Sequence, residues 1–111
     1  MEIKLSFAGE TPIFHINGRL DVTTSPLLED RLMPLLSVHG QHVVFDCESL
    51  VYVSSAGLRV FISTQRTLST QDGGIAFASL TPPVRELFHL AGLEGLFIIE
   101  TSLTKAISRL S

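Results

Sequence analysis

The sequence predicts an α/β sandwich, with a mixed, mostly parallel sheet of about five strands and about four helices. Residues 3–7 and 13–16 alternate apolar and polar side chains, which is typical of an antiparallel hairpin. From residue 42 onward, short apolar runs alternate regularly with amphipathic segments. Because strands joined by a crossover helix lie parallel, this second part predicts a parallel sheet to which the hairpin adds antiparallel strands.

The first 41 residues contain two turn signals and one helix. Residues 9–12 connect the strands of the hairpin, and Asn17-Gly18 is a second strong turn signal. Ser25 and Pro26 are typical of a helix start, with Ser25 as the N-cap and Pro26 as the first helical residue. Four leucines supply the buried stripe of this helix: Leu28, Leu32, Leu35 and Leu36.

Pro34 lies inside this leucine pattern and conflicts with a regular helix. Proline lacks the amide hydrogen and crowds the carbonyl group four residues earlier, here that of Asp30. Because the leucine periodicity continues past Pro34, we expect a kink there rather than a helix end near Met33.

Three further strands are expected, at residues 42–46, 75–78 and 96–99, since each is a short apolar run. Three helices follow them. The first contains Leu58, Phe61, Ile62 and Leu68 at helical spacing, with a break at Gln65, and is expected to stop at Asp72-Gly73-Gly74, where a glycine can adopt the left-handed conformation. The second starts at Thr81-Pro82-Pro83 and ends at Gly92. Its inward-facing side chains are expected to be Val84, Leu87, Phe88 and Ala91. The last presents one face made of Leu103, Ala106, Ile107 and Leu110.

Composition limits the classes of function. The 111 residues fit one domain, expected to span residues 1–111, and the net charge is only −3 with no two consecutive Lys or Arg residues. Nucleic-acid binding is therefore not expected. No apolar run approaches a membrane span, and the N-terminus lacks a signal-peptide core. The single Cys47 fits a reducing cytoplasm, and the four histidines show no metal-ligand spacing, so we expect a cytoplasmic protein without metal or cofactor.

Ser54 and Ser55 form the most informative feature, because they lie just before the helix that contains Leu58. A serine there normally accepts hydrogen bonds from the first free amides of the helix. A phosphate would meet the same amides and the positive end of the helix dipole, which contributes about 0.3–1 kcal/mol at an exposed site. The segment is suited either to a structural cap or to a phosphorylation switch.

Four motifs resemble, in order and spacing, the STAS domain family of bacterial anti-sigma factor antagonists. Together they extend over nearly the whole chain. They are Val53-Ser54-Ser55-Ala56-Gly57-Leu58, Gly18-Arg19-Leu20-Asp21, Val44-Phe45-Asp46, and the segment from Pro83 to Leu93.

The resemblance implies a STAS-like sandwich that works by partner switching and is not itself an enzyme. Ser55 occupies the family's phosphoacceptor position, and Ser54 is the second choice. The implied partners are an anti-sigma factor with serine kinase activity of the GHKL type, which binds the unphosphorylated protein, and a PP2C-type serine phosphatase. The protein alone is expected to be a monomer. Its expected contact residues are Asp21, Thr23, Thr24, Ser25, Ser54, Ala56, Gly57 and Arg59.

Several of these residues have alternative interpretations. Residues 23–25 suit helix capping, and Asp21 suits a turn in which it bonds its own backbone. Ser54 stands where the family often has Asp, and Arg59 where it commonly has Gly. Arg59 is either a partner for a phosphate on Ser55, four residues earlier, or an exposed helix residue.

Two other functions remain open. One is a STAS module that senses a small ligand or nucleotide without phosphorylation. The other is a serine hydrolase that uses Ser54 or Ser55 with His15, His39, His42 or His89. Neither serine has a glycine two residues before it, as the G-x-S-x-G elbow requires, so the hydrolase is the remote alternative.

Overall fold

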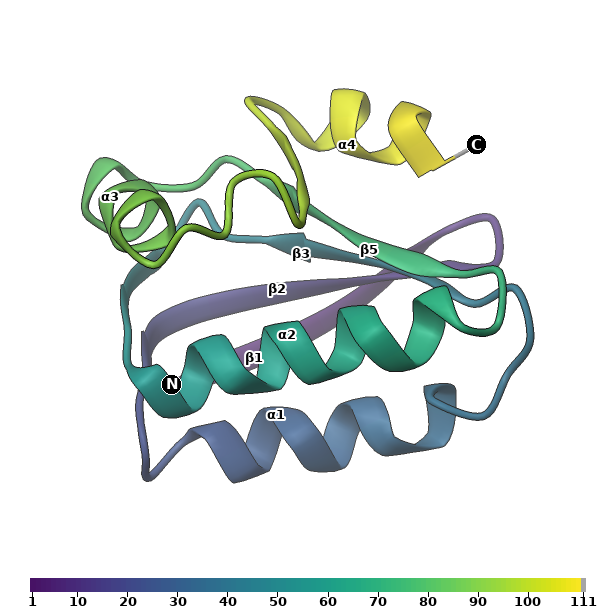
Figure 1. Ribbon diagram of the computed structural model, residues 1–111, viewed down its shortest axis with the longest axis horizontal. Helices are drawn as coiled ribbons and strands as arrows, with labels where there is room; N and C mark the ends of the chain where they lie inside the picture. The colour runs from purple at the N-terminus through teal and green to yellow at the C-terminus, as the bar shows by residue number, and fades with distance from the viewer. Residues whose placement is uncertain (111) are drawn as a thin grey trace.

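A six-stranded sheet lies between α4 on one face and α1 and α2 on the other (Figure 1). The computed structural model describes residues 1–110. The strands are β1 (Glu2–Ala8), β2 (Thr11–Leu20), β3 (His42–Asp46), β4 (Leu50–Val53), β5 (Gly74–Ala78) and β6 (Ile98–Glu100). The helices are α1 (Ser25–Leu32), a 3-10 helix (Met33–Leu35), α2 (Ser55–Ser69), α3 (Pro82–Leu90) and α4 (Leu103–Leu110).

The strand order is β1-β2-β3-β5-β6, and β4 also pairs with β2. Within residues 1–110, β1 and β2 form the one antiparallel pair, and the other four strand pairs are parallel. This confirms the predicted mixed, mostly parallel sheet. The sequence prediction missed β4, whose four residues follow shortly after β3 in the sequence. It also placed the last strand two residues too early at its start, since β6 begins at Ile98.

Strand β2 changes its partner along its length. Residues 13–15 pair with β3 and residues 18–20 pair with β4, with a register shift between Gly18 and Arg19. Gly18 has a φ of +97° and donates its amide to the carbonyl of Ser49 at 2.8 Å. The prediction of a turn at Asn17-Gly18 is therefore wrong: glycine here permits an irregularity inside a continuous strand.

Two cores fill the space between the layers. The larger lies under α1, α2 and α3 and contains a chain of phenylalanine rings whose neighbouring centroids lie 4.8–6.2 Å apart. The rings are those of Phe14, Phe45, Phe61, Phe77, Phe88 and Phe97. The smaller core, under α4, contains Ile13, Val44, Ala76, Ala78 and Ala106. Fully burying a phenylalanine side chain stabilises the fold by about 1.5–3 kcal/mol, so the larger core dominates.

The first helix starts and ends differently from the prediction. Thr24, not Ser25, is the N-cap residue, and the hydroxyl of Ser25 donates to the carbonyl of Asp21 at 2.6 Å. The α-helix ends at Leu32 and continues as the 3-10 helix. Pro34 therefore changes the hydrogen-bonding pattern instead of kinking an α-helix, because it has no amide to donate.

The end of α2 also differs in detail. Asp72 rather than a glycine adopts the left-handed conformation, with a φ of +62°, and the amide of Gly73 donates to the carbonyl of Leu68 at 2.9 Å. Gln65 breaks the apolar pattern because its side-chain oxygen accepts from the amide of Ile75 at 2.9 Å. In α3, Ala91 is exposed rather than turned inward.

The carboxyl ends of the parallel strands bring residues 46–55 and 79–81 to one edge of the sheet. The amide of Cys47 donates to the carbonyl of Ala78 at 2.9 Å. The hydroxyl of Thr81 donates to the carbonyl of Leu50, also at 2.9 Å. These bonds join the segment that leads to Ser55 to the start of α3.

We expect Gly73→Ala to destabilise the fold by about 3 kcal/mol or more, because a Cβ atom there would lie 1.9 Å from the carbonyl oxygen of Gln41. Gly95→Ala is the matched control, since nothing lies within 4 Å of its Cβ position. Urea unfolding of both variants measures the difference. Equal unfolding free energies would show that the contact between Gly73 and Gln41 does not constrain the fold.

Candidate partner-binding site

Ser54 and Ser55 occupy different structural positions. Ser54 is the N-cap of α2: its amide donates to the carbonyl of Leu20 at 2.8 Å, and its hydroxyl accepts from the amide of Gly57 at 3.3 Å. Ser55 is the first helical residue and its side chain is exposed, with no hydrogen-bond partner for its hydroxyl within residues 1–110. The structural cap and the available hydroxyl therefore belong to two adjacent residues.

Gly57 brings the start of α2 close to the sheet. A Cβ atom at this position would lie 2.8 Å from Val53 Cγ1 and 2.9 Å from Leu20 Cγ. Gly57 is buried, and its predicted contact with a partner stays a prediction. Its role is to let the helix that bears Ser55 pack directly against β2 and β4.

Asp21 organises the turn between β2 and α1. Its Oδ1 atom accepts from the amides of Thr23 at 3.0 Å and Thr24 at 3.1 Å. The hydroxyl of Thr24 in turn accepts from the amide of Asp21 at 2.8 Å and donates to the carbonyl of Arg19 at 2.9 Å. The backbone hydrogen bond from Thr24 lowers the pKa of Asp21 below its ordinary value. These contacts fit the turn interpretation of Asp21.

The neighbouring predicted contact residues differ in exposure. Thr23 is exposed, Thr24 is half-buried, and Ser25 is buried with its hydroxyl bonded to Asp21. Ser25 therefore supports the turn. Thr23 presents a side chain that a partner can reach.

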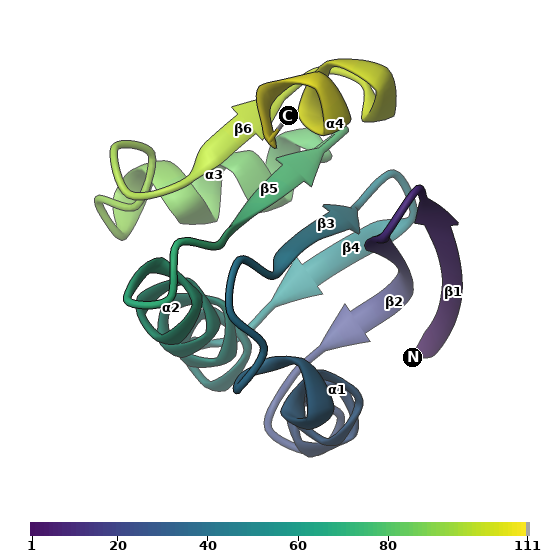
Figure 2. The same cartoon turned by 90° about the vertical axis from the view of Figure 1, so that its right-hand side faces the viewer.

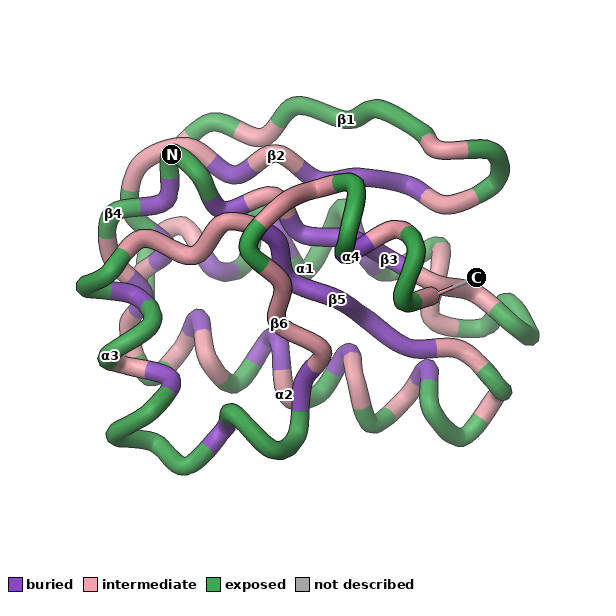
Figure 3. Tube along the Cα trace, turned by 90° about the horizontal axis from the view of Figure 1, so that it is seen from above, coloured by how far each residue is buried: buried purple, intermediate pink, exposed green. Residues whose placement is uncertain are grey.

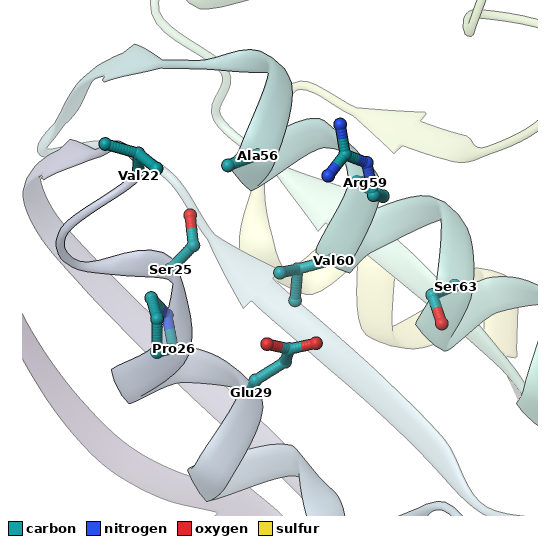
Figure 4. Close-up of a pocket in the computed structure, with 8 residues that line it drawn as sticks. All are labelled: Val22, Ser25, Pro26, Glu29, Ala56, Arg59, Val60 and Ser63. Atoms are coloured by element: carbon teal, nitrogen blue, oxygen red, sulfur yellow. The ribbon is translucent and has the colours of Figure 1, made fainter.

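A groove of about 320 Å³ lies between α1 and α2, and Ala56, the residue after Ser55, is part of its lining (Figure 4). It brings together three of the predicted contact residues, Ser25, Ala56 and Arg59. Its other lining residues, which the sequence prediction missed, are Val22, Pro26, Glu29, Val60 and Ser63. Arg59 on α2 and Glu29 on α1 give the groove one charge of each sign.

Val22 is an apolar residue whose side chain is 74% exposed. One sequence signal was available: an apolar residue stands alone in the polar stretch between Asp21 and Thr23. Hydrophobic periodicity does not identify Val22, because this residue belongs to neither a strand nor a helix.

No histidine of residues 1–110 forms a hydrogen bond with Ser54 or Ser55. His15 on β2 bonds instead to two residues on neighbouring strands: its Nε2 lies 2.8 Å from Ser6 Oγ and its Nδ1 2.6 Å from Asp46 Oδ2. This chain of bonds links β1, β2 and β3 across the sheet face. The structure gives no support to a hydrolase centred on Ser54 or Ser55.

Two further observations concern metals and membranes. No cluster of three or more His, Cys, Asp or Glu side chains able to hold a metal ion occurs in the described part of the chain. The helices formed by residues 1–110 include none with the length and apolar character needed to cross a membrane. Burial raises the pKa of the Cys47 thiol, and the charge of Asp46 adds to this effect, so the thiol is unreactive in the folded protein.

Comparison with known proteins identifies the family. Residues 2–106 match the STAS domain, and the chain belongs to this family, among its anti-sigma factor antagonists. The anti-sigma-B factor antagonist of Staphylococcus aureus (strain NCTC 8325) is 30% identical over 81 residues, which cover 73% of this chain and 75% of that protein. The family and fold implied by the sequence motifs are thereby confirmed.

Two solved structures share the fold. An anti-sigma factor antagonist from Mycobacterium paratuberculosis has a TM-score of 0.87 at 21% identity, covering 98% of this chain and 92% of that one. The phosphorylated form of the Bacillus cell fate determinant SpoIIAA has a TM-score of 0.75 at 20% identity, covering 99% and 100% of the two chains.

We expect Ser54→Ala to lower the free energy of unfolding by about 1 kcal/mol, because the cap of α2 is lost. The neighbouring change Ser55→Ala should leave it within about 0.5 kcal/mol, since the side chain is exposed. Chemical denaturation of both variants gives the comparison. The reverse order of effects would mean that Ser55 is the cap.

Acid should weaken the contribution of Asp21 to stability. Its pKa is lower in the folded protein than its ordinary value of 3.8, so its contribution is complete above that value and is lost as the pH falls through the lowered pKa. We expect Asp21→Asn to show a shallower loss of unfolding free energy than the parent protein between about pH 5 and pH 2. The control Glu10→Gln, an exposed carboxylate outside the site, should retain the parental slope. Parallel slopes for the parent and Asp21→Asn would refute this assignment.

Proposed function

We propose that this chain is an anti-sigma factor antagonist that acts by partner switching in the cytoplasm, as a regulator of transcription and not as an enzyme. In its unphosphorylated form it binds an anti-sigma factor that is also a serine kinase of the GHKL type. Phosphorylation of Ser55 releases the partner, and a PP2C-type phosphatase restores binding. The observation that supports this most directly is the exposed Ser55 at the start of α2, beside a groove and with the helix cap supplied by Ser54.

The surface around Ser55 suits a switch based on charge. The residues that line the groove between α1 and α2 include the small or apolar Val22, Pro26 and Ala56, and the two charged residues of the groove have opposite signs. A phosphate adds a charge of roughly −1.5 to −2 and three acceptor oxygens. On a close-packed, nearly neutral interface this brings repulsion and desolvation costs, and about 3–4 kcal/mol lowers affinity several hundredfold.

The phosphorylated state needs no rearrangement of the fold. The Ser55 hydroxyl makes no hydrogen bond that the modification would break, and the cap on Gly57 belongs to Ser54. The amides of Ser55 and Ala56 have no acceptor among the described residues, so they are available to phosphate oxygens at the positive end of the helix dipole. Arg59, exposed one turn later, is placed to add a charge-assisted hydrogen bond.

A second candidate function is ligand sensing without phosphorylation. The groove of about 320 Å³ between α1 and α2 supports it, because this volume lies at the lower end of the range of small-molecule sites. In that case a ligand in the groove would change the partner surface instead of a phosphate on Ser55.

Phosphate analysis of the protein isolated from its own cells distinguishes these functions. Intact-mass measurement and peptide mapping should find one phosphate on Ser55, which is absent from Ser55→Ala. A phosphate on Ser54 would keep the mechanism but move the switch. No phosphate under any growth condition would reject partner switching at this site and favour the ligand-sensing function.

Binding measurements provide the second arm of this test. The unphosphorylated protein is used to capture the partner kinase, and calorimetry then compares Ser55→Glu with Ser55→Ala. We expect the glutamate variant to bind at least about a hundredfold more weakly and the alanine variant to bind like the parent protein. Equal affinities for the two variants would contradict a charge-based switch.

A further inference from the structure

We propose that two copies of this chain associate through β1, whose outer edge pairs antiparallel with its equivalent in the second copy. Strand β1 is the first in the strand order and pairs only with β2, over seven residues without a register shift. Figures 2 and 3 show no other element beyond it on the outer side. The outer edge of β1 therefore presents unpaired backbone donors and acceptors, which is a template for another strand.

This edge lacks most of the usual protection against pairing. Proteins protect edge strands by making them short, by placing charged residues (especially Lys), proline or a bulge in them, or by covering them. The opposite edge follows this rule, because β6 has three residues and α4 packs against it. Strand β1 contains neither proline nor bulge, and its two charged residues, Glu2 and Lys4, form an ion pair with each other at 3.8 Å.

One face of β1 bears an apolar row that the helices leave partly uncovered. Ile3, Leu5 and Phe7 alternate onto the same face, and Ile3 packs against the larger core on the side of α1. Leu5 is 42% exposed and Phe7 is 63% exposed, although their cross-strand neighbours Phe14 and Pro12 are buried. The helices therefore do not cover the part of β1 that contains Leu5 and Phe7.

A groove of about 330 Å³ lies beside this row, between β1 and α1. Its lining residues are Met1, Ile3, Leu27, Asp30 and Arg31. If a two-fold axis passes through Leu5, each Leu5 lies opposite its equivalent and Phe7 of one copy lies opposite Ile3 of the other. The exposed phenylalanine of each copy then meets the groove of the second copy, which is the self-complementary arrangement that a two-fold dimer requires.

Other registers fit less well. An axis through Lys4 places two lysines directly opposite each other, which is destabilising. An axis through Ile3 leaves Phe7 outside the paired region. With the axis at Leu5, all seven residues pair, Lys4 lies opposite Ser6, and Glu2 lies opposite Ala8, so no like charges are directly opposed.

The resulting interface is small. It consists of one strand pair and two inserted phenylalanines, which is at the low end of specific interfaces, so we expect a weak, reversible dimer. The expectation of a monomer followed from the family resemblance, and the proposed dimer departs from it. Ser55 and the groove between α1 and α2 lie outside the pairing strand, so the proposal is independent of the function of that site.

Sedimentation velocity over a range of concentrations tests the association. The parent protein should form a reversible dimer, and Phe7→Lys should raise its dissociation constant at least about tenfold. Leu90→Lys is the matched control, because Leu90 is 73% exposed on α3, away from β1, and should associate like the parent protein. A parent protein that stays monomeric at the highest soluble concentration, or equal association of Phe7→Lys and the parent, would overturn the proposal.

Cross-linking tests the register. Leu5→Cys places two thiols at the two-fold axis, where a short bis-maleimide should join the copies, while native Cys47 is fully buried and does not react. Leu90→Cys measures the background from random collisions. Efficient dimer formation by Leu5→Cys alone supports the pairing described, and equal yields from the two variants would exclude it. Circular dichroism of each variant confirms that the fold is retained.

Discussion

Strand β2 forms hydrogen bonds with β1, β3 and β4, and the placement of the candidate partner-binding site depends on how its ten residues are shared among them. The first part of β2 holds β3 in the sheet, and the irregularity at Gly18 lets its last residues pair with β4. The final carbonyl of the strand, that of Leu20, then accepts the amide of Ser54. One strand therefore fixes both the turn at Asp21 and the start of α2.

The phenylalanine core gives this arrangement its rigidity. Phe45 and Phe77 lie on adjacent parallel strands, and Phe61 on α2 contacts both rings with centroid distances of 4.9 and 4.8 Å. Aromatic pairs in offset or edge-to-face geometry contribute about 0.5–1.5 kcal/mol beyond the burial of their area. Because Phe61 lies in the second turn of α2, this packing holds the helix near Ser55 in a single position. A switch at Ser55 then has a fixed surface on which to act.

Two properties of the site favour a local change of charge over a conformational change. The capping hydrogen bond belongs to Ser54, so a modification of Ser55 leaves it intact. Gly57 packs against Val53 and Leu20 too closely for the helix start to shift inward. Under the proposed switch, Ser54, which stands where the family often has Asp, would supply a capping oxygen without a second negative charge beside a phosphate on Ser55.

The sequence by itself determined the order of nearly all elements, the mixed sheet, the inward faces of the helices and the family, because these depend on local periodicity and on short motifs such as that around Ser55. It also named as partner contacts Ser25, Ala56 and Arg59, which line the groove between α1 and α2. It missed β4, the exposed Val22 and the groove, and it assigned Asn17-Gly18 to a turn. Tertiary structure decided these points, since pairing partners, helix-to-sheet distance and exposure arise from contacts between residues far apart in the chain. Whether a serine caps a helix or faces solvent depends on such contacts, and neither the identity of Ser54 and Ser55 nor their spacing contains that information.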